Sequence, residues 1–421
     1  TLFRSSGVGN ASATLTNNGS IDISANAVAS GTAGTATADA SVQGIFQSAT
    51  ANDGSATASL ANTGSINITA NASAIATGAA DASASVNTGI SQNAFADTGD
   101  ATVTLSNSST GTIDITATAT ANGDASASAD ASVSSAINQY ATATGGGNAS
   151  ATITNDGAIN LTATATAVSA NGLADASASV SSAISQTASA AGGGDATVTL
   201  TNSSTGSIDI AAVANATGTD ANANASLSES VVYQSASANG GGDASVTLTN
   251  STVSGNLVQS ASGNAAAASL AGNVSLTLNN CTVAQNDVAA SSRGASIVRS
   301  RCTVTAEPLA TLTSTIVAMT NSSNSAYSDL ADDGSTFSNS WIANNSLVQR
   351  TSATLSGAGN LTSVDPLLAA LAWNGGSTRS HALASSSPAL NAGSNVLALS
   401  TDQRGQARVF GTAADIGAYE A

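Results

Sequence analysis

A five-residue phrase, glycine followed by a small residue, isoleucine, a polar residue and isoleucine or leucine, recurs along the chain. Its copies start at Gly19, Gly64, Gly111, Gly157 and Gly206, so successive copies lie 45 to 49 residues apart. A period of this length is typical of stacked repeat proteins, in which each repeat packs on its neighbours. The sequence therefore predicts a repeat architecture and not a globular enzyme.

Each repeat divides into two halves that open alike. Gly99-Asp100-Ala101 opens one half and Gly123-Asp124-Ala125 opens the other, 24 residues later. We therefore expect a β-solenoid with about 23 residues per turn, in which the longer repeat is two turns of alternating type.

Strict alternation of apolar and polar residues identifies the strands. In Ala101–Leu105 and Ile113–Ala121, Ala, Val, Leu and Ile alternate with Thr or Asp, which places the two kinds on opposite faces of a strand. The predicted fold is all-β, a parallel β-helix. Because the inward positions are mostly Ala, its core should be narrow and flattened.

Aromatic residues make up only 3% of the chain. Four of them recur once per long repeat beside a glutamine, and we expect them to fill a corner of the core; they are Phe46, Phe95, Tyr140 and Tyr233, beside Gln47, Gln92, Gln139 and Gln234. The alternative is an exposed aromatic platform for sugars.

The polar position of the phrase alternates between carboxylate and amide, in the order Asp22, Asn67, Asp114, Asn160, Asp209. With two turns per repeat, successive Asp residues would lie roughly 19 Å apart, beyond a Debye length of about 8 Å. We interpret the alternation as a device that keeps like charges from stacking.

Charge is scarce and one-sided: the chain has 8 basic and 25 acidic residues, no Lys, and a formal net charge of -17. Between Arg4 and Arg293 there is no basic side chain, so nucleic acid and anionic membranes are poor partners. No stretch is apolar for long enough to predict membrane insertion.

The two cysteines, Cys281 and Cys302, both stand in Cys-Thr-Val and are 21 residues apart, close to one expected turn. Stacked on neighbouring turns, their Cα atoms would satisfy disulfide geometry. We expect a cross-turn disulfide and an oxidising compartment. Two independent buried thiols are the alternative.

Three regions are expected: regular repeats over 1–255, irregular β-helix turns over 256–356, and a carboxy-terminal cap over 357–421. The cap carries a series of motifs: Asp365-Pro366-Leu367-Leu368, Trp373-Asn374-Gly375-Gly376, Ser387-Pro388-Ala389-Leu390-Asn391-Ala392-Gly393, Thr401-Asp402-Gln403-Arg404-Gly405 and Asp415-Ile416-Gly417-Ala418-Tyr419-Glu420. In this order they resemble the carboxy-terminal region of bacterial choice-of-anchor Q surface proteins. Asn391 stands where that family usually has Asp, and no anchor follows Ala421.

The resemblance implies a right-handed parallel β-helix exported to the cell surface or beyond. The repeats themselves resemble, more loosely, the β-solenoid stalks of adhesins and filamentous surface proteins.

Candidate catalytic groups are few. His381 has no second His beside it, and we expect it to knit the cap together with Arg379, Arg404, Arg408, Asp402 and Asp415. A two-carboxylate hydrolase around Asp329, Asp332 and Asp333 stays open. The turns at 192–195 and 240–243 resemble calcium-binding glycine turns but lack the nine-residue spacing, so no metal and no cofactor is expected.

Threonines form a possible outward array: Thr116, Thr118 and Thr120 with Thr162, Thr164 and Thr166. Regular Thr grids on narrow solenoids resemble ice-binding surfaces, whereas Thr is also simply a soluble strand former.

We expect a non-catalytic structural protein, extracellular or on the bacterial cell surface. An uncovered solenoid end invites strand pairing, so the edge at Gly9, Asn10, Ala11, Ser12 and Ala13 is expected to meet another copy head-to-tail and build a filament. The rivals are a monomeric adhesin stalk and a carbohydrate-binding or polysaccharide-degrading protein, with cell-surface glycans as the partner.

Overall fold

The computed structural model describes residues 2–421 apart from 33, 204–205, 229–231, 240–241, 255–256, 259–264, 272–273, 289–294, 301–306, 319–327, 333–336, 338, 352 and 377–378. Every regular element in this part of the chain is a β-strand, and the strands pair in parallel except β35 (Ala372–Trp373) with β36 (Arg379–Ser380). This confirms the predicted all-β parallel solenoid. No described segment is an apolar helix of membrane-spanning length. The chain forms two compact units: unit 1 is 1–188 with 206–235, and unit 2 is 189–205 with 236–421.

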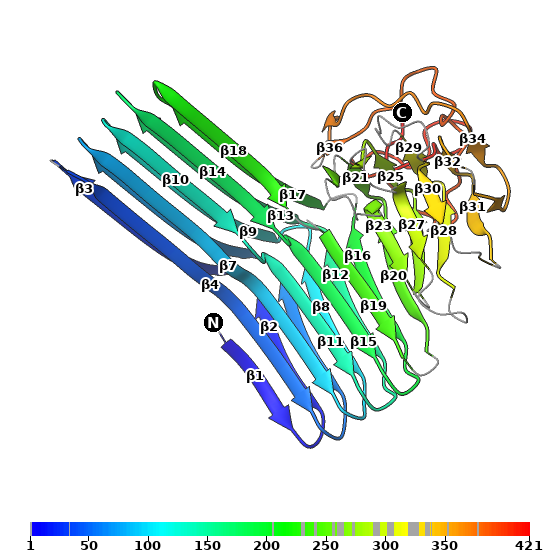
Figure 1. Cartoon of the computed structure of the whole chain (residues 1–421). Helices are drawn as coiled ribbons and strands as arrows, with labels where there is room; N and C mark the ends of the chain where they lie inside the picture. Colours follow the sequence, from blue (N-terminus) through cyan, green and yellow to red (C-terminus); the bar gives the residue numbers. More distant parts are fainter. Residues whose placement is uncertain are drawn as a thin grey trace. The chain divides into compact units, whose positions relative to one another are not determined.

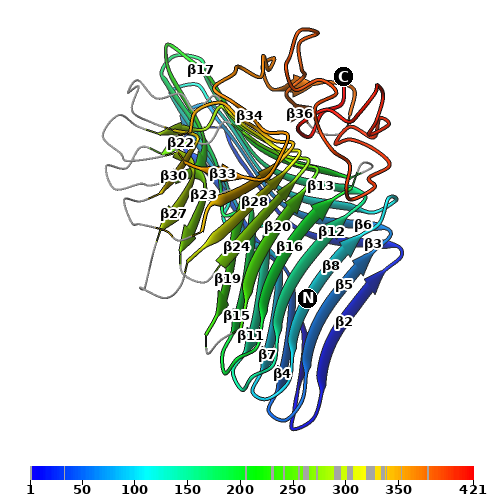
Figure 2. The same cartoon turned by 90° about the vertical axis from the view of Figure 1, so that its right-hand side faces the viewer.

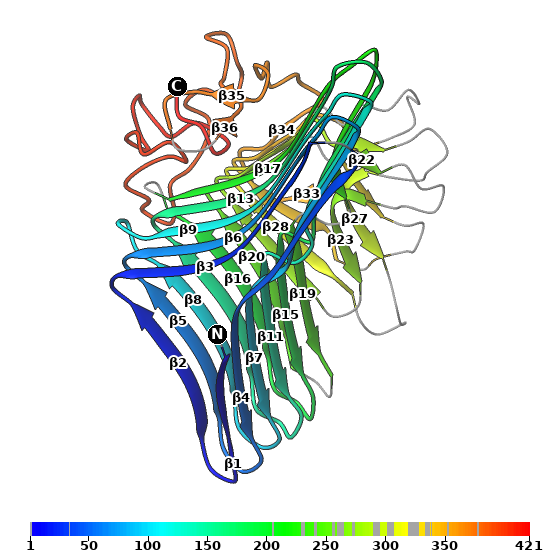
Figure 3. The same ribbon diagram turned by 90° about the vertical axis from the view of Figure 1, so that its left-hand side faces the viewer.

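Three sheets build unit 1 (Figures 1 to 3), and each rung contributes a strand to every sheet. The first follows β2 (Ala11–Asn17), β5 (Ala56–Asn62), β8 (Ala101–Asn107) and β12 (Ala149–Asn155). The second follows β3 (Ser20–Gly31), β6 (Ser65–Ala76), β9 (Thr112–Gly123), β13 (Ala158–Ser169) and β17 (Ser207–Thr217). The third joins the long strands β4 (Ala36–Ala51) and β7 (Ala79–Ala96) to β10 (Ser126–Val133), β11 (Ile137–Ala143), β14 (Leu173–Ser181), β15 (Ile184–Ala190), β18 (Asp220–Ser228) and β19 (Val232–Ala238), with β1 (Leu2–Gly7) on β4.

One rung of unit 1 is a whole repeat, so the predicted turn of about 23 residues is wrong there. Asn17 bonds to Asn62, 45 residues on, Gln92 to Gln139, 47 residues on, and Asn107 to Asn155, 48 residues on. The two halves that open alike belong to different sheets of the same rung, since Ala101 begins β8 and Ser126 begins β10. Both walls use the same alternation of Ala with polar residues, which makes one rung look like two turns.

Alanine lines the walls of unit 1, and two ladders of buried amides run through them. Gln92, Gln139 and Gln186 each donate through Nε2 to the Oε1 of the glutamine one rung earlier, at 2.8, 2.9 and 2.8 Å. Asn17, Asn62 and Asn107 each donate through Nδ2 to the asparagine one rung later, at 2.7, 2.8 and 2.8 Å. The amides thus satisfy one another in a core without room for water.

The aromatic residues beside the glutamines do not fill the core. Phe95, Tyr140 and Tyr233 are 40%, 44% and 45% exposed, and Phe46 is half-buried. The glutamines stand in phase with the inward alanines, such as Ala94 beside Gln92, so their aromatic neighbours point outward. The predicted corner filling is therefore wrong.

The glycine that opens the repeated phrase is required by the stacking. A Cβ at Gly64 would overlap the carbonyl of Gly19 one rung earlier, and a Cβ at Gly157 would overlap those of Gly111 and Ser108. Only glycine lets the backbones of successive rungs approach so closely at this corner.

Unit 2 continues in shorter rungs. One sheet follows β16 (Ala196–Asn202), β20 (Ala244–Thr249), β24 (Val274–Asn279), β28 (Leu309–Thr313), β31 (Trp341–Asn344) and β33 (Leu355–Ser356). Beside it run β21 (Thr252–Ser254), β25 (Thr282–Ala284), β29 (Ile316–Ala318), β32 (Leu347–Val348) and β34 (Leu361–Thr362). Smaller sheets join β22 (Leu257–Val258) to β26 (Asp287–Val288), and β23 (Ala265–Ala271) to β27 (Ala295–Ser300) and β30 (Leu330–Asp332).

The length of these rungs falls along the unit. Cys281 bonds to Thr315, 34 residues on, Thr315 to Ser346, 31 residues on, and Ser346 to Asn360, 14 residues on. The carboxy-terminal segment then packs Leu383, Ala389 and Ile416 against Ile316 and Leu347 in a compact apolar cluster.

Candidate functional site

The predicted assembly edge lies at the first rung of unit 1. Gly9 and Asn10 form the turn before β2, and Ala11, Ser12 and Ala13 begin that strand. On one side the edge is bonded to the next rung: the Ala11 amide donates to the Ser55 carbonyl at 3.0 Å, and Asn10 Oδ1 accepts from the Ser55 amide at 2.9 Å. On its other side β2 has no partner strand among the described residues.

The apolar interior is open at this end. Inward residues of β3, such as Ile21 and Ile23, are only partly buried, whereas Ile66 and Ile68 at the same positions of β6 are fully buried. On the outward face, Val28 is 80% exposed. Wet isoleucine and alanine on an edge strand are the features that favour addition of another strand.

Unit 1 has a second open edge at β17 and β18, the last strands of their sheets on that side. The inward residues Ile208 and Ile210 are only partly buried, and Ala221 and Ala223 are exposed. Strand β17 repeats the Ser-Ile-Asp-Ile order of β3. The sequence analysis missed this edge because its signal, the loss of long rungs after β18, is visible only once the rung length is known.

The carboxylate and amide column is a hydrogen-bonded ladder. The Asn67 amide donates to Asp22 Oδ1, and the Asn160 amide donates to Asp114 Oδ1 at 2.6 Å. Hydrogen bonds from Asn67 and Ser20 lower the pKa of the Asp22 carboxyl. Asp22 and Asp114 stand two rungs apart, which is about 10 Å and not the expected 19 Å, so the amide between them does the work of separation.

A second set of carboxylates lies on the outward face of the third sheet. Asp81 pairs with Ser128 and Asp130 with Ser83 on the neighbouring strands, so like charges lie on the diagonal. Partial burial, and then the charges of Asp81 and Asp175, raise the pKa of Asp130.

The carboxylates weighed for a hydrolase are engaged in structure. Asp332 forms an ion pair with Arg299 at 2.9 Å and accepts from Trp341 Nε1 at 3.1 Å. Asp329 is buried and accepts from the Arg350 amide at 2.7 Å, and Asp333 lies outside the described residues. In the described part of the chain, no three His, Cys, Asp or Glu side chains are grouped as a metal site.

His381 joins the carboxy-terminal segment to the solenoid. Its Nδ1 lies 2.8 Å from the Ala369 carbonyl and therefore donates, which leaves Nε2 to accept from the Ser254 hydroxyl at 2.7 Å. Burial lowers the pKa of this imidazole. Nearby, Arg404 pairs with Asp402 at 2.8 Å, and Arg408 donates to the carbonyls of Asp415 and Gly417. The structure thus shows the predicted hydrogen bonds and ion pair of the cap for these residues.

Cys281 is fully buried, and its Sγ lies 3.2 Å from the Asn279 carbonyl. Burial raises the pKa of this thiol to about 11. Its predicted partner Cys302 lies outside the described residues. The spacing argument for a disulfide does not hold, because the rung spacing at Cys281 is 34 residues and not 21.

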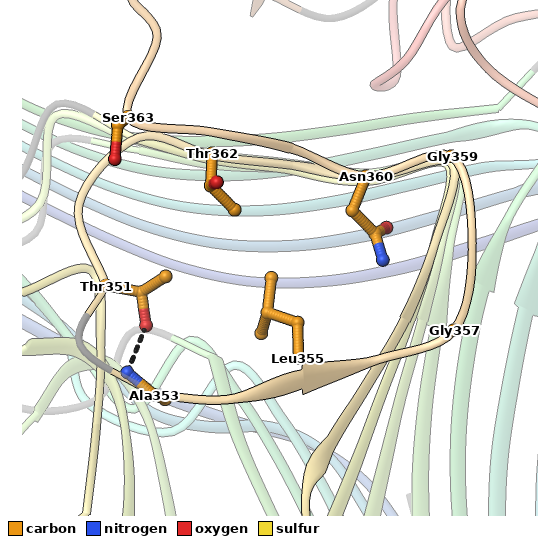
Figure 4. Close-up of a pocket in the computed structure, with 8 residues that line it drawn as sticks. All are labelled: Thr351, Ala353, Leu355, Gly357, Gly359, Asn360, Thr362 and Ser363. Carbon is orange, nitrogen blue, oxygen red and sulfur yellow. Dashed lines mark hydrogen bonds between the residues drawn. The ribbon is translucent and has the colours of Figure 1, made fainter.

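A shallow depression of about 440 Å³ lies beside β33 and β34 (Figure 4), lined by Thr351, Ala353, Leu355, Gly357, Gly359, Asn360, Thr362 and Ser363. The Asn360 amide donates to the Ala343 carbonyl at 2.6 Å, and its Oδ1 accepts from the Ser346 amide at 3.1 Å. These lining residues offer hydroxyl and amide groups but no general acid or base.

Comparison of the chain with protein-family models, curated proteins and solved structures gives no match. The resemblance of residues 357–421 to choice-of-anchor Q proteins therefore stays a prediction.

Proposed function

We propose that the protein is a non-catalytic, extracellular structural protein of a bacterial surface, whose solenoid units associate head-to-tail into a filament. The observation that supports this most is the open amino-terminal edge, where β2 and β3 present unpaired edges and partly wet isoleucines. We also propose a right-handed coil, the hand of about 98% of parallel β crossovers.

The direction of the contact follows from strand polarity. All strand pairs within unit 1 are parallel. A strand that extends the β3 or β4 sheet in parallel therefore comes from the opposite edge of another copy, which in unit 1 is the edge at β17 and β18. Such a contact is heterologous, and repetition of it gives an open fibre.

Electron microscopy and light scattering over a range of protein concentrations test the proposal. The variant Ser24→Lys with Asn26→Lys places two charges on β3, which should block pairing at this edge and leave single particles. Its matched control is Thr116→Lys with Thr118→Lys, which occupies the same two columns on the interior strand β9. We expect fibres from the wild type and the control. Isolated rods from the wild type at high concentration would favour the stalk instead.

Ice binding is a second candidate, because the threonine array is tighter than expected. Thr116, Thr118 and Thr120 pair directly with Thr162, Thr164 and Thr166 on the adjacent strand, so their spacing is about 4.8 Å between strands and about 6.8 Å along them. A thermal hysteresis assay tests this. Activity that disappears in Thr118→Leu would support it, and a wild type without activity would rule it out.

A further inference from the structure

We propose that the outward face of the third sheet, where β4, β7 and β11 end, binds a neutral polysaccharide chain. The surface is a grid of nine side chains, three from each strand, which we call the aromatic grid; they are Phe46, Ser48 and Thr50, then Ser91, Asn93 and Phe95, then Asn138, Tyr140 and Thr142. The three strands lie side by side in Figure 1. This inference goes beyond the structural role proposed above and does not depend on it.

The register distributes the aromatic residues evenly. Tyr140 pairs with Asn93, which pairs with Ser48, and Thr142 pairs with Phe95, which pairs with Thr50. Each strand and each column of the grid therefore holds one aromatic ring and two small polar groups. With about 4.8 Å between strands and about 6.8 Å between alternate residues, the grid covers roughly 10 by 14 Å.

Exposed rings on a soluble sheet need a reason, since large apolar side chains on a surface tend to mark binding sites. Phe95 and Tyr140 are 40% and 44% exposed. Sugar rings have apolar C–H faces and hydroxyl edges, and amphipathic aromatic rings interleaved with amides and hydroxyls match both. Serine, threonine and asparagine fill the rest of the grid.

Charge favours a neutral ligand over an acidic one. No member of the grid is ionisable near neutral pH, and the nearest cation in register is Arg4 on β1, which pairs with Ser48. The carboxylates Asp81 and Asp130 lie on the other half of the same sheet. An anionic glycan would meet one arginine and a row of carboxylates, whereas a neutral chain meets no repulsion.

Asn138 supplies an unused acceptor. Its Oδ1 is buried and has no hydrogen-bond partner among the described residues. A buried acceptor without a donor is costly, by about 1 to 3 kcal/mol. Since χ2 of asparagine is broad, a small rotation presents this oxygen to a sugar hydroxyl beside Tyr140.

A depression adjoins the grid at Phe46. It has a volume of about 510 Å³ and is lined by Leu2, Gln43, Gly44, Ile45, Phe46, Thr88 and Ser91. It lies where the register of β4 on β7 shifts between Val42 and Gln43, and such bulges bend a strand and re-aim side chains. The buried glutamine ladder beneath holds the grid rigid, which lowers the entropy cost of binding.

Affinity electrophoresis in gels that contain a neutral polysaccharide tests the proposal, with xyloglucan, galactomannan, β-1,3-glucan and starch as neutral probes and alginate as the acidic probe. We expect the wild type to be retarded by at least one neutral probe and not by alginate. The double variant Phe95→Ala with Tyr140→Ala should bind at least tenfold more weakly, while Tyr140→Phe keeps most of the affinity. The matched control is Phe410→Ala, which removes a 78% exposed ring from unit 2 and should bind like the wild type.

Three results would overturn the proposal. The wild type may bear no affinity for any neutral probe, or bind alginate alone, or bind equally well after loss of both rings. Analytical ultracentrifugation of the same variants adds a fourth: if the double variant loses self-association and no glycan binding exists, the grid is a contact between copies. Circular dichroism melts verify that the variants fold.

Discussion

At the scale of single residues, the core of unit 1 is held by amides as much as by apolar contact. The glutamine ladder donates toward earlier rungs and the asparagine ladder toward later rungs. Each glutamine also crosses the core, as Gln139 does when its Nε2 donates to the Thr152 carbonyl at 3.1 Å. The ladders therefore bind neighbouring rungs together and the two walls of a rung to each other.

We predict that Gln139→Leu destabilises unit 1 by about 1 to 3 kcal/mol, the cost of leaving Gln92 Oε1 without its donor. Circular dichroism of thermal or denaturant unfolding measures the loss. The same substitution at the exposed Gln43 is the control and should be nearly neutral. Equal stability of the two variants would show that the ladder contributes nothing.

We predict that unit 2 weakens as the pH falls below the ordinary imidazole pKa of about 6.5. Because burial lowers the pKa of His381 in the fold, the unfolded chain binds the proton more readily, and stability is lost as the solution becomes more acidic. Denaturant titrations followed by Trp fluorescence report on this unit, since both Trp residues, Trp341 and Trp373, lie in it. The variant His381→Asn should flatten the dependence between pH 7 and 5; an unchanged slope would contradict the assignment.

The direction of each side chain follows from alternation, provided that the phase is read from alanine. Gln92 shares the phase of Ala94 and Ala96, and Phe95 does not. Hydrophobicity alone suggests the opposite, with the ring inside and the amide outside. An alanine-lined core has no room for a phenyl ring, whereas a column of amides fits because each partner satisfies the next.

At the scale of strands and turns, a close-packed glycine column sets how tightly rungs approach. We predict that Gly157→Ala costs about 1 to 3 kcal/mol, because its Cβ would meet the backbone of the previous rung. Gly7→Ala is the matched control, since nothing lies within 4 Å of the added Cβ. Melting temperatures of the two variants decide the question, and a harmless Gly157→Ala would mean that the rungs are further apart.

Strand positions were predictable and rung length was not. Alternation in Ile113–Ala121 locates most of β9 (Thr112–Gly123) to within two residues. The half-repeat near 23 residues misled because β8 and β10 open with similar sequences, Gly-Asp-Ala in each case, although they lie in different sheets. Sequence similarity reports a shared strand pattern, and only pairing tells whether two similar strands are neighbours.

At the scale of the whole molecule, the account rests on one rung per repeat. It predicts which residues lie one step apart over the entire regular region, and the aromatic grid and the threonine array both depend on that register. A solenoid with two turns per repeat would place Thr116 near residue 139 or 140 and would separate the members of the grid.

Engineered disulfide cross-linking tests this most directly. In a Cys281→Ser, Cys302→Ser background, Thr116→Cys with Thr162→Cys pairs residues in direct register on β9 and β13, where a separation of about 4.8 Å suits a disulfide. The comparison is Thr116→Cys with Tyr140→Cys, 24 residues apart in the sequence. After mild oxidation, mass spectrometry of non-reduced fragments should find the first pair linked and the second free. Linkage of the second pair, with the first left reduced, would contradict the account.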